Sequence, residues 1–325
     1  MPITSVDKNI EELTMTVVAD FPVPVERLWD AYADPRQLEK FWGPVEFPAT
    51  FTRHDMFPGG LSQYVMTGPN GEISAGYWEF VSIDRPKSFE VIDGFANDDG
   101  TPNTEFPTIR MTFQFEPTPE GSRLITTSYF DSIEHLQQLV DMGMEEGMKS
   151  AMSQIDDVLA DLASFAAGRG TEAQILNDTQ VRTSRIVRGT VEQVWRAHTE
   201  ADLVKRWMLG PDGWTMPVAD VASEAGQPYR YEWENEETGE RFGFVGEVLE
   251  AQPPYRIVTT ESMIGMEGPP AVNELTFKEV DGGTLVNIVI TYPSTEVRDM
   301  VLASGMVDGM ETSYARLEDE VLAAA

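Results

Sequence analysis

The stretch GMEEGM occupies residues 143–148, and GMVDGM repeats its pattern at residues 305–310. Each copy lies inside an apolar-periodic run that predicts a long helix. A glycine in a helix interior costs about 1 kcal/mol relative to alanine, so the pair of glycines in each copy needs a physical reason. Either another backbone packs closely against the glycine side of the helix, or the missing side chains leave a cavity there.

Apolar residues at helical spacing run through both copies of this motif. In the first copy they are Leu139, Val140, Met144, Met148, Met152, Ile155 and Leu159, and in the second Val301, Leu302, Met306, Met310, Tyr314, Leu317 and Val321. Gly143 and Gly147, like Gly305 and Gly309, fall on one flank of this stripe. Methionine stripes are typical of packed cores, but the flexible, polarizable thioether also suits a pocket for irregular apolar ligands.

The chain repeats itself well beyond this motif. The matched segments, in unchanged order, are 25–44 with 191–211, 79–91 with 247–258, and 111–124 with 275–286. Trp29 pairs with Trp195 in this comparison, and Trp42 pairs with Trp207. Two tandem copies of one domain are therefore predicted, with the first domain at 1–166, a small and polar linker at 167–179, and the second domain at 180–325.

Each copy shows the same order of predicted elements. A strand at 13–21 or 181–189 precedes a helix at 25–34 or 191–200, and a short second helix follows. A series of strands separated by Gly, Pro, Asn and Asp turns comes next, and a closing helix begins after Ser132 or Ser294 as N-cap. Because the helices are segregated from an antiparallel sheet, the predicted fold class is α+β.

The segment FPVPVERLWDAYADPRQLEKFWGP, the later proline-containing strand pair and the closing helix with GMEEGM resemble the START-like or SRPBCC (Bet v 1-type) superfamily. The most similar branch is the bacterial domains that resemble the C-terminal domain of the activator of Hsp90 ATPase. Both copies match nearly end to end. The resemblance implies two helix-grip domains, each a curved antiparallel sheet wrapped around a long C-terminal helix, with a pocket between them.

Composition and charge exclude several classes of function. The net charge of −32 is shared by both halves, with 11 basic and 28 acidic residues over 1–170 and 12 and 27 over 171–325. Such a surface repels phosphate backbones and anionic lipid, which disfavours nucleic-acid and membrane partners. The sequence has no cysteine, which rules out disulfides and thiolate chemistry, and its N-terminus lacks the pattern of a signal peptide. These features favour a soluble cytoplasmic protein.

Metal and catalytic motifs are missing. The three histidines, His54, His135 and His198, have no metal-pair spacing, and the last two are predicted on helix surfaces. The loop at 93–106 does not fit an EF-hand, because Phe95 and Phe106 would fall at its ligand positions. It is interpreted as a mouth or lid. No metal, cofactor or catalytic residue is therefore predicted.

The predicted pocket residues are polar or aromatic side chains within strands, tryptophans after the short helix, and the glycines and methionines of the closing helix. In the first copy they are Trp42, His54, Tyr64, Trp78, Arg110, Gly143, Met144, Gly147 and Met148. In the second they are Trp207, Tyr231, Trp233, Arg241, Gly305, Met306, Gly309 and Met310.

Three functions compete. The first is a non-catalytic protein that binds a small hydrophobic molecule, such as a lipid or aromatic metabolite. The second, from the resemblance alone, is a co-chaperone-like activator of Hsp90 ATPase with a protein partner, although no counterpart of the activator's other domain is recognisable. The third is a polyketide-cyclase-like enzyme, in which Arg110, Tyr64 or His54 would polarise carbonyls or move protons. The copies need not share a role, since Met152 stands opposite Tyr314.

Overall fold

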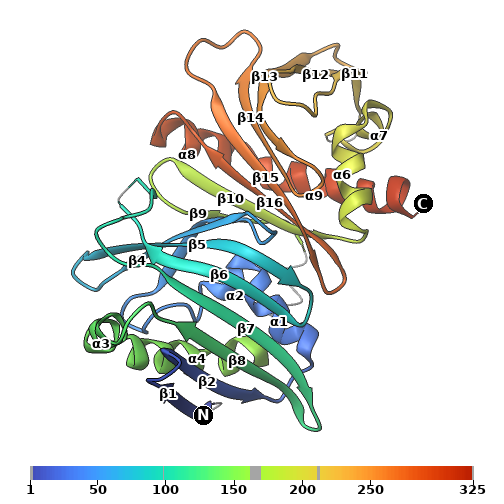
Figure 1. Ribbon diagram of the computed structural model, residues 1–325. Coiled ribbons are helices and arrows are strands. Elements are labelled where there is room, and N and C mark those ends of the chain that lie inside the picture. The colour runs from blue at the N-terminus through green and yellow to red at the C-terminus, as the bar shows by residue number, and fades with distance from the viewer. Residues whose placement is uncertain (1–2, 98, 162–169, 211–212, 324–325) are drawn as a thin grey trace. The chain divides into compact units, whose positions relative to one another are not determined.

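The computed structural model describes residues 3–97, 99–161, 170–210 and 213–323. The chain divides into two compact units, Met1–Leu162 and Ala163–Ala325. Each unit holds one eight-stranded antiparallel sheet with helices, so the predicted α+β class and tandem arrangement are confirmed. Figure 1 shows the elements of both units.

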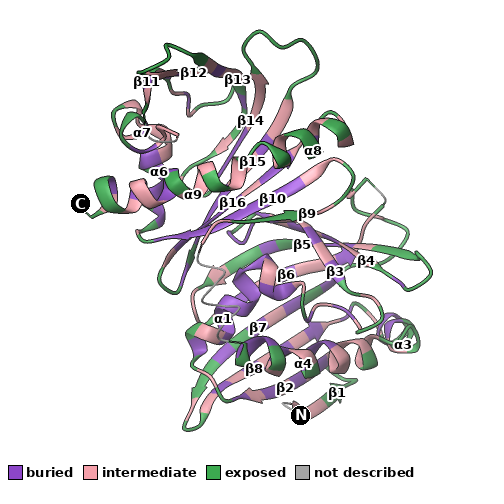
Figure 2. Cartoon of the chain, turned by 180° about the vertical axis from the view of Figure 1, so that it is seen from behind, coloured by how far each residue is buried: buried purple, intermediate pink, exposed green. Residues whose placement is uncertain are grey.

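The first unit has the strand order β1-β2-β8-β7-β6-β5-β4-β3. Its strands are β1 (Ile3–Asn9), β2 (Thr14–Phe21), β3 (Ala49–His54), β4 (Leu61–Thr67), β5 (Ile73–Asp84), β6 (Ser88–Phe95), β7 (Ile109–Thr118) and β8 (Gly121–Tyr129). Its helices are α1 (Val25–Ala33), α2 (Pro35–Leu38), α3 (Ile133–Asp141) and α4 (Met144–Ala160). Within this unit, α1, α3 and α4 lie on the same face of the sheet (Figures 1 and 2).

The second unit has the order β11-β12-β13-β14-β15-β16-β10-β9. Its strands are β9 (Glu172–Ile175), β10 (Gln180–Val187), β11 (Trp214–Asp220), β12 (Pro228–Asn235), β13 (Arg241–Gln252), β14 (Arg256–Met263), β15 (Ala271–Val280) and β16 (Gly283–Thr291). Its helices are α6 (Val191–Thr199), α7 (Ala201–Trp207), α8 (Thr295–Ala303) and α9 (Met306–Arg316), which continues as a π-helical segment, η1 (Leu317–Leu322).

The core of the first unit follows from strand alternation and aromatic packing. Every second residue of β2 is buried, so one face of the strand covers the core, as the banding in Figure 2 illustrates for the sheets. Trp29 of α1 packs edge-on against Phe89 and Phe115, with ring centroids 5.8 Å and 5.2 Å away. Such T-shaped contacts are favourable for aromatic rings and fix the first helix on the sheet.

The closing helix is not continuous in either unit, which corrects the sequence prediction. Ser132 and Ser294 are N-caps as predicted, because each hydroxyl accepts a backbone N–H three residues later. The helix then breaks at Gly143 and Gly305, whose φ values of +90° and +84° are left-handed. These two glycines therefore begin a second helix, and neither lies in a helix interior.

Two strands were not predicted from the sequence. β1 pairs with β2 at one edge of the first sheet. β9 pairs with β10 at one edge of the second sheet, although its residues 172–175 fall within the predicted linker. Residues 167–169 of the predicted linker lie outside the described residues.

Candidate functional site

The first unit contains a cavity of about 440 Å³ between its sheet and its helices. The walls are mostly apolar. The lining residues are Tyr32, Phe41, Trp42, Gly43, Pro44, Tyr64, Met66, Ser74, Asp93, Gly94, Phe95, Pro107, Ile109, Met111, Phe113, Thr126, Leu139, Met142, Met144, Gly147, Met148, Ala151 and Met152. Met142 and Pro107 are exposed as well as lining, so the cavity opens to solvent there.

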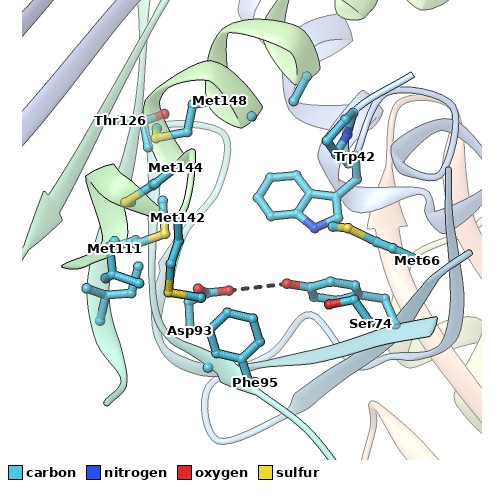
Figure 3. A pocket seen from close by; sticks show the side chains of 18 of the residues that line it. Trp42, Met66, Ser74, Asp93, Phe95, Met111, Thr126, Met142, Met144 and Met148 are labelled. Carbon is cyan, nitrogen blue, oxygen red and sulfur yellow. Dashed lines mark hydrogen bonds between the residues drawn. The ribbon is translucent and has the colours of Figure 1, made fainter. Parts of the chain in front are cut away.

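Methionines form much of the cavity wall. Met142, Met144, Met148 and Met152 come from α4 and the bend before it, whereas Met66 and Met111 come from β4 and β7. In Figure 3, Met142, Met144 and Met148 lie on one side of the space, and Trp42 and Met66 lie across from them. Unbranched thioether side chains change rotamer easily, so this wall adapts to irregular apolar shapes.

Gly147 contributes to the cavity by lacking a side chain. It lies in the first turns of α4, and a Cβ placed on it would meet no atom within 4 Å. Close packing of another backbone against this glycine is therefore excluded, and the missing side chain leaves open space. Gly143 has a different role. It is exposed, and its left-handed backbone conformation favours glycine at this position.

Asp93 is the one charged side chain among the described residues that line the cavity. Its Oδ1 accepts hydrogen bonds from Trp78 Nε1 at 2.9 Å and from the Tyr64 hydroxyl at 3.4 Å, the second of which is the dashed line in Figure 3. Burial in this apolar space raises the pKa of Asp93 to about 6, while the two hydrogen bonds oppose the rise. The same burial, with the nearby Asp93 charge, holds the pKa of Tyr64 well above its usual value.

Five of the predicted residues of the first unit line this cavity: Trp42, Tyr64, Met144, Gly147 and Met148. Trp78 does not line it but is fully buried behind the wall, where it supports Asp93 and packs edge-on against Trp42 at 4.5 Å. Gly143 is not part of the lining.

His54 and Arg110 were predicted to face the pocket and do not. His54 is buried in the core, with Nδ1 2.6 Å from Ser62 Oγ and Nε2 3.0 Å from the Tyr32 carbonyl oxygen. Arg110 is exposed on the other face of β7, where it contacts Glu90 at 3.3 Å and stacks over the Tyr129 ring. Strand alternation accounts for this, because Ile109 and Met111 on either side of Arg110 point inward. Two of the three groups assigned to cyclase-like chemistry are thus outside the cavity.

In the second unit, a packed aromatic side chain, Tyr314, stands at the helix position that Met152 has in the first unit. Tyr314 of α9 stacks on Trp207 with ring centroids 5.3 Å apart, and both are buried in the core. His198 of α6 packs against the same two rings. Its Nδ1 is 2.7 Å from the Val194 carbonyl oxygen and its Nε2 is 3.3 Å from the Tyr314 hydroxyl, which fits a neutral ring that donates from Nδ1 and accepts at Nε2.

His135 and His198 were predicted on helix surfaces, and this prediction is wrong. Burial lowers the pKa of His198 to about 4, so the ring is neutral at physiological pH and serves packing. His135 is buried, with its ring edge-on to Phe130, whereas His198 is half-buried between α6 and the aromatic core.

The other predicted residues of the second unit are dispersed. Trp233 donates its Nε1 hydrogen to the Met208 carbonyl oxygen and stacks on Phe242, and Tyr231 is half-buried beside Trp233. Met310 packs against the core that contains Tyr314, and the Met306 sulfur accepts a hydrogen bond from Tyr292. Arg241 is exposed and pairs with Glu234, Gly305 is exposed at the helix break, and a Cβ on Gly309 would meet no atom within 4 Å.

The structure also corrects one pairing between the copies. Asp34 and Glu200 are the C-caps of α1 and α6. The same number of residues beyond each cap leads to Phe41 in the first unit and to Trp207 in the second. Trp207 therefore corresponds to Phe41, which contacts Tyr32 as Trp207 contacts His198. Trp42 corresponds to Met208 by this count.

Sequence reasoning missed Asp93, although a signal for it was present. Phe89, Val91 and Asp93 alternate along β6, and the first two are buried. Period-two spacing places the Asp93 carboxylate on the same inward face. The second unit keeps an acid at this place, since Asp93 and Glu261 are each the sixth residue of their strand, and burial raises the pKa of Glu261 as well.

A sheet that grips a closing helix and leaves an apolar cavity defines a helix-grip domain. The family model for activator of Hsp90 ATPase homolog 1-like protein matches the chain twice, over residues 22–160 and 188–321. The chain therefore belongs to this family and carries two tandem copies of its domain, which confirms the resemblance seen in the sequence.

Several solved structures are similar to about half of the chain. Protein Ms6760 from Mycobacterium smegmatis is 48% identical and matches 49% of this chain and 98% of its own, with a TM-score of 0.47. A protein from Arthrobacter aurescens is 44% identical over 49% of this chain and 93% of its own, with a TM-score of 0.47. A Rhodobacter sphaeroides protein is 30% identical over 48% and 99%, with a TM-score of 0.45. The comparison with curated proteins found no match.

Neither a metal cluster nor a membrane-spanning helix is found among the described residues. No group of three or more His, Cys, Asp or Glu side chains in that part of the chain is arranged to hold a metal ion. The described helices include none with the length and apolar character needed to cross a membrane.

Proposed function

We propose that the first unit binds a small hydrophobic molecule in its cavity and does not catalyse a reaction. The observation that carries this proposal is the cavity of about 440 Å³, walled by six methionines and aromatic rings and kept open by Gly147. Ligand pockets typically measure about 300–1,000 Å³ and combine apolar walls with a few polar groups. The cavity has both properties.

We infer that the second unit has a supporting role, because aromatic side chains are packed in its core. Tyr314 occupies the helix position that Met152 has in the first unit, and it stacks on Trp207. A ligand in this place would have to displace a buried aromatic pair, which is unfavourable. We therefore assign binding to the first unit.

Native mass spectrometry with a panel of lipids and aromatic metabolites tests the proposal. We expect retained complexes with molecules that are mainly apolar. A Met152→Tyr variant, which places the second unit's side chain in the first cavity, serves as the blocked control. Failure of the whole panel to bind the unmodified protein at millimolar concentration argues against the proposal.

The family supports a second candidate, activation of Hsp90 ATPase through a protein–protein contact. The test is steady-state ATP hydrolysis by Hsp90 with and without this chain. Unchanged turnover at a large excess of the chain removes this candidate and leaves the binding proposal untouched.

We also infer a cytoplasmic location, without nucleic-acid or membrane partners. The sequence has no cysteine, which suits a reducing compartment, and its charge of −32 repels nucleic acid and anionic lipid. Cell fractionation with an antibody to the chain tests this inference, and recovery in the membrane or nucleic-acid fraction contradicts it.

A further inference from the structure

The cavity wall contains a carboxylate with an unused acceptor. Trp78 and Tyr64 both donate to Oδ1 of Asp93, and no described residue donates a hydrogen bond to Oδ2. The described lining residues include no Lys, Arg or His that would balance the charge. Asp93 is half-buried, and its carboxylate lines the cavity. A ligand that fills the cavity without supplying a donor would take this acceptor out of water and leave it without a partner, which is costly, so a ligand that supplies a donor binds more tightly.

We propose that the cavity selects molecules that are apolar over most of their surface and carry one O–H or N–H donor, which Asp93 accepts. This inference rests on the proposed function of the first unit. Trp78 holds the carboxylate from behind at 2.9 Å, so the acceptor is oriented before a ligand arrives. The methionine wall accommodates the apolar part of the ligand, and Asp93 fixes its polar end.

The same geometry rejects ligands that end in a carboxylate. Two carboxylates in an apolar space repel each other, and neither has a cation beside it. Discrimination by a buried polar group is larger than discrimination by apolar contacts, because the wrong ligand leaves that group without a partner. The donor class therefore binds best, the apolar class less well, and the anionic class worst.

The ionisable groups that face Asp93 do not change charge over the pH range in which Asp93 itself titrates. Tyr64 on β4 and Tyr77 on β5 are the titratable neighbours, and the pKa of each is raised by burial and by the Asp93 charge. Both phenols therefore stay neutral through the range in which Asp93 changes charge. When Asp93 is protonated, it becomes a donor itself, and the penalty against an anionic ligand falls.

Four naphthalenes of similar size test this selectivity, substituted with an ethyl, hydroxymethyl, aminomethyl or carboxylate group. Isothermal titration calorimetry of the full chain gives each affinity at a pH of about 8 and about 5, on either side of the Asp93 pKa. At the higher pH, we expect the hydroxymethyl and aminomethyl compounds to bind with an affinity at least about ten-fold higher than that of the ethyl compound. We expect the carboxylate to bind weakest and to improve at the lower pH.

Three variants separate the contribution of Asp93 from the contributions of other polar side chains. Asp93→Asn keeps an acceptor but removes the charge, and we expect it to abolish the preference for the aminomethyl compound and the penalty against the carboxylate. Glu261→Gln, at the equivalent place in the second unit, is expected to leave the affinities of all four compounds unchanged. Thr126→Val removes a second polar group of the wall, the Thr126 hydroxyl, which is buried and has no hydrogen-bond partner among the described residues. This variant is expected to preserve the ranking.

The outcomes distinguish the two proposals. Equal affinity for the ethyl, hydroxymethyl and aminomethyl compounds, or a ranking that follows Thr126 and not Asp93, overturns the inference while the binding function stands. Binding of none of the four compounds overturns the inference together with the proposed function for aromatic ligands. Circular dichroism of each variant confirms that it is folded before its affinity is interpreted.

Discussion

At Gly143 the backbone φ is +90°, whereas Gly147 lies in a right-handed helix with free space around its missing Cβ. Alanine at position 143 would have to adopt a left-handed conformation, which costs about 1–2 kcal/mol. Alanine at position 147 removes a helix-interior glycine without a clash, which gains up to about 1 kcal/mol. We therefore expect Gly143→Ala to lower and Gly147→Ala to raise the free energy of unfolding in urea.

Gly305 and Gly309 provide the matched pair in the second unit. Gly305 has a φ of +84°, and a Cβ on Gly309 would meet no atom within 4 Å. We therefore expect Gly305→Ala to lower and Gly309→Ala to raise the free energy of unfolding. Equal effects at both glycines of a pair would contradict the distinction between a helix junction and a helix interior.

Asp93 makes the stability of the first unit depend on pH. Its pKa rises from about 3.8 in the unfolded chain to about 6 in the folded protein, so the folded state holds the proton more tightly. Stability is therefore highest below the unfolded pKa, falls as pH rises through the folded pKa, and is then constant, with a total loss of about 1–3 kcal/mol. We expect Asp93→Asn to raise the free energy of unfolding near pH 8 and to have little effect near pH 4.

The stability of Asp93→Asn is compared with that of the unmodified protein by urea denaturation without ligand. Asp20→Asn is the control of opposite sign, because the hydrogen bond and charge of Arg123 lower the pKa of Asp20. Losing that carboxylate should destabilise the protein at neutral pH. An Asp93→Asn variant that is less stable than the unmodified protein near pH 8 would show that the carboxylate is not desolvated.

Residue-level prediction from the sequence succeeded where periodicity decides the outcome and failed where backbone conformation decides it. Helical spacing predicted a shared face for Met144, Gly147 and Met148, and all three line the cavity. Nothing in that spacing distinguishes Gly147 from Gly143, because both satisfy the same stripe. Asp93 was predictable from strand alternation and was nevertheless missed, although its neighbours on β6 carry the signal.

Helices α4 and α9 stand at equivalent places but present different side chains. Met152 lines an open cavity, whereas Tyr314 fills the corresponding space against Trp207 and His198. We expect Met152→Tyr to lower the affinity for hydroxymethylnaphthalene at least ten-fold, measured by calorimetry, because the ring takes the space of the ligand. The cavity accommodates the larger side chain, so this variant should remain folded.

Tyr314→Met is the reciprocal control. It removes the stacking on Trp207 and the contact with His198, and we expect it to destabilise the second unit by about 2 kcal/mol through the space it leaves. Its affinity for the naphthalene should not change. An unchanged affinity in Met152→Tyr would place the ligand elsewhere.

At the level of elements, the order of strands and helices was predictable from repeated turns and helical spacing, whereas β1, β9 and the helix break were not. β9 is fully exposed, so it has no buried face to create an alternating pattern. The break at Gly143 is invisible because the apolar stripe continues from α3 into α4. Tertiary pairing and a left-handed glycine decide these features, and neither leaves a periodic signal.

On the scale of the whole molecule, duplication has produced two copies of one fold with different interiors. The halves carry similar charges of −17 and −15, from 11 against 28 and 12 against 27 basic and acidic residues. Their surfaces are therefore alike in charge while their cores differ at Met152 and Tyr314. The difference predicts how many ligands one chain binds.

We expect one ligand per chain, bound by the first unit. Native mass spectrometry of the full chain with aminomethylnaphthalene should show a single adduct that persists at excess ligand, and calorimetry should give a stoichiometry near one. Met152→Tyr should remove that adduct, whereas Tyr314→Met should keep it, because only the first cavity holds both free space and the Asp93 acceptor among the described residues compared here. Two adducts of similar affinity in the unmodified chain would mean that the aromatic core around Tyr314 opens to a ligand, and the division of roles between the units would then be wrong.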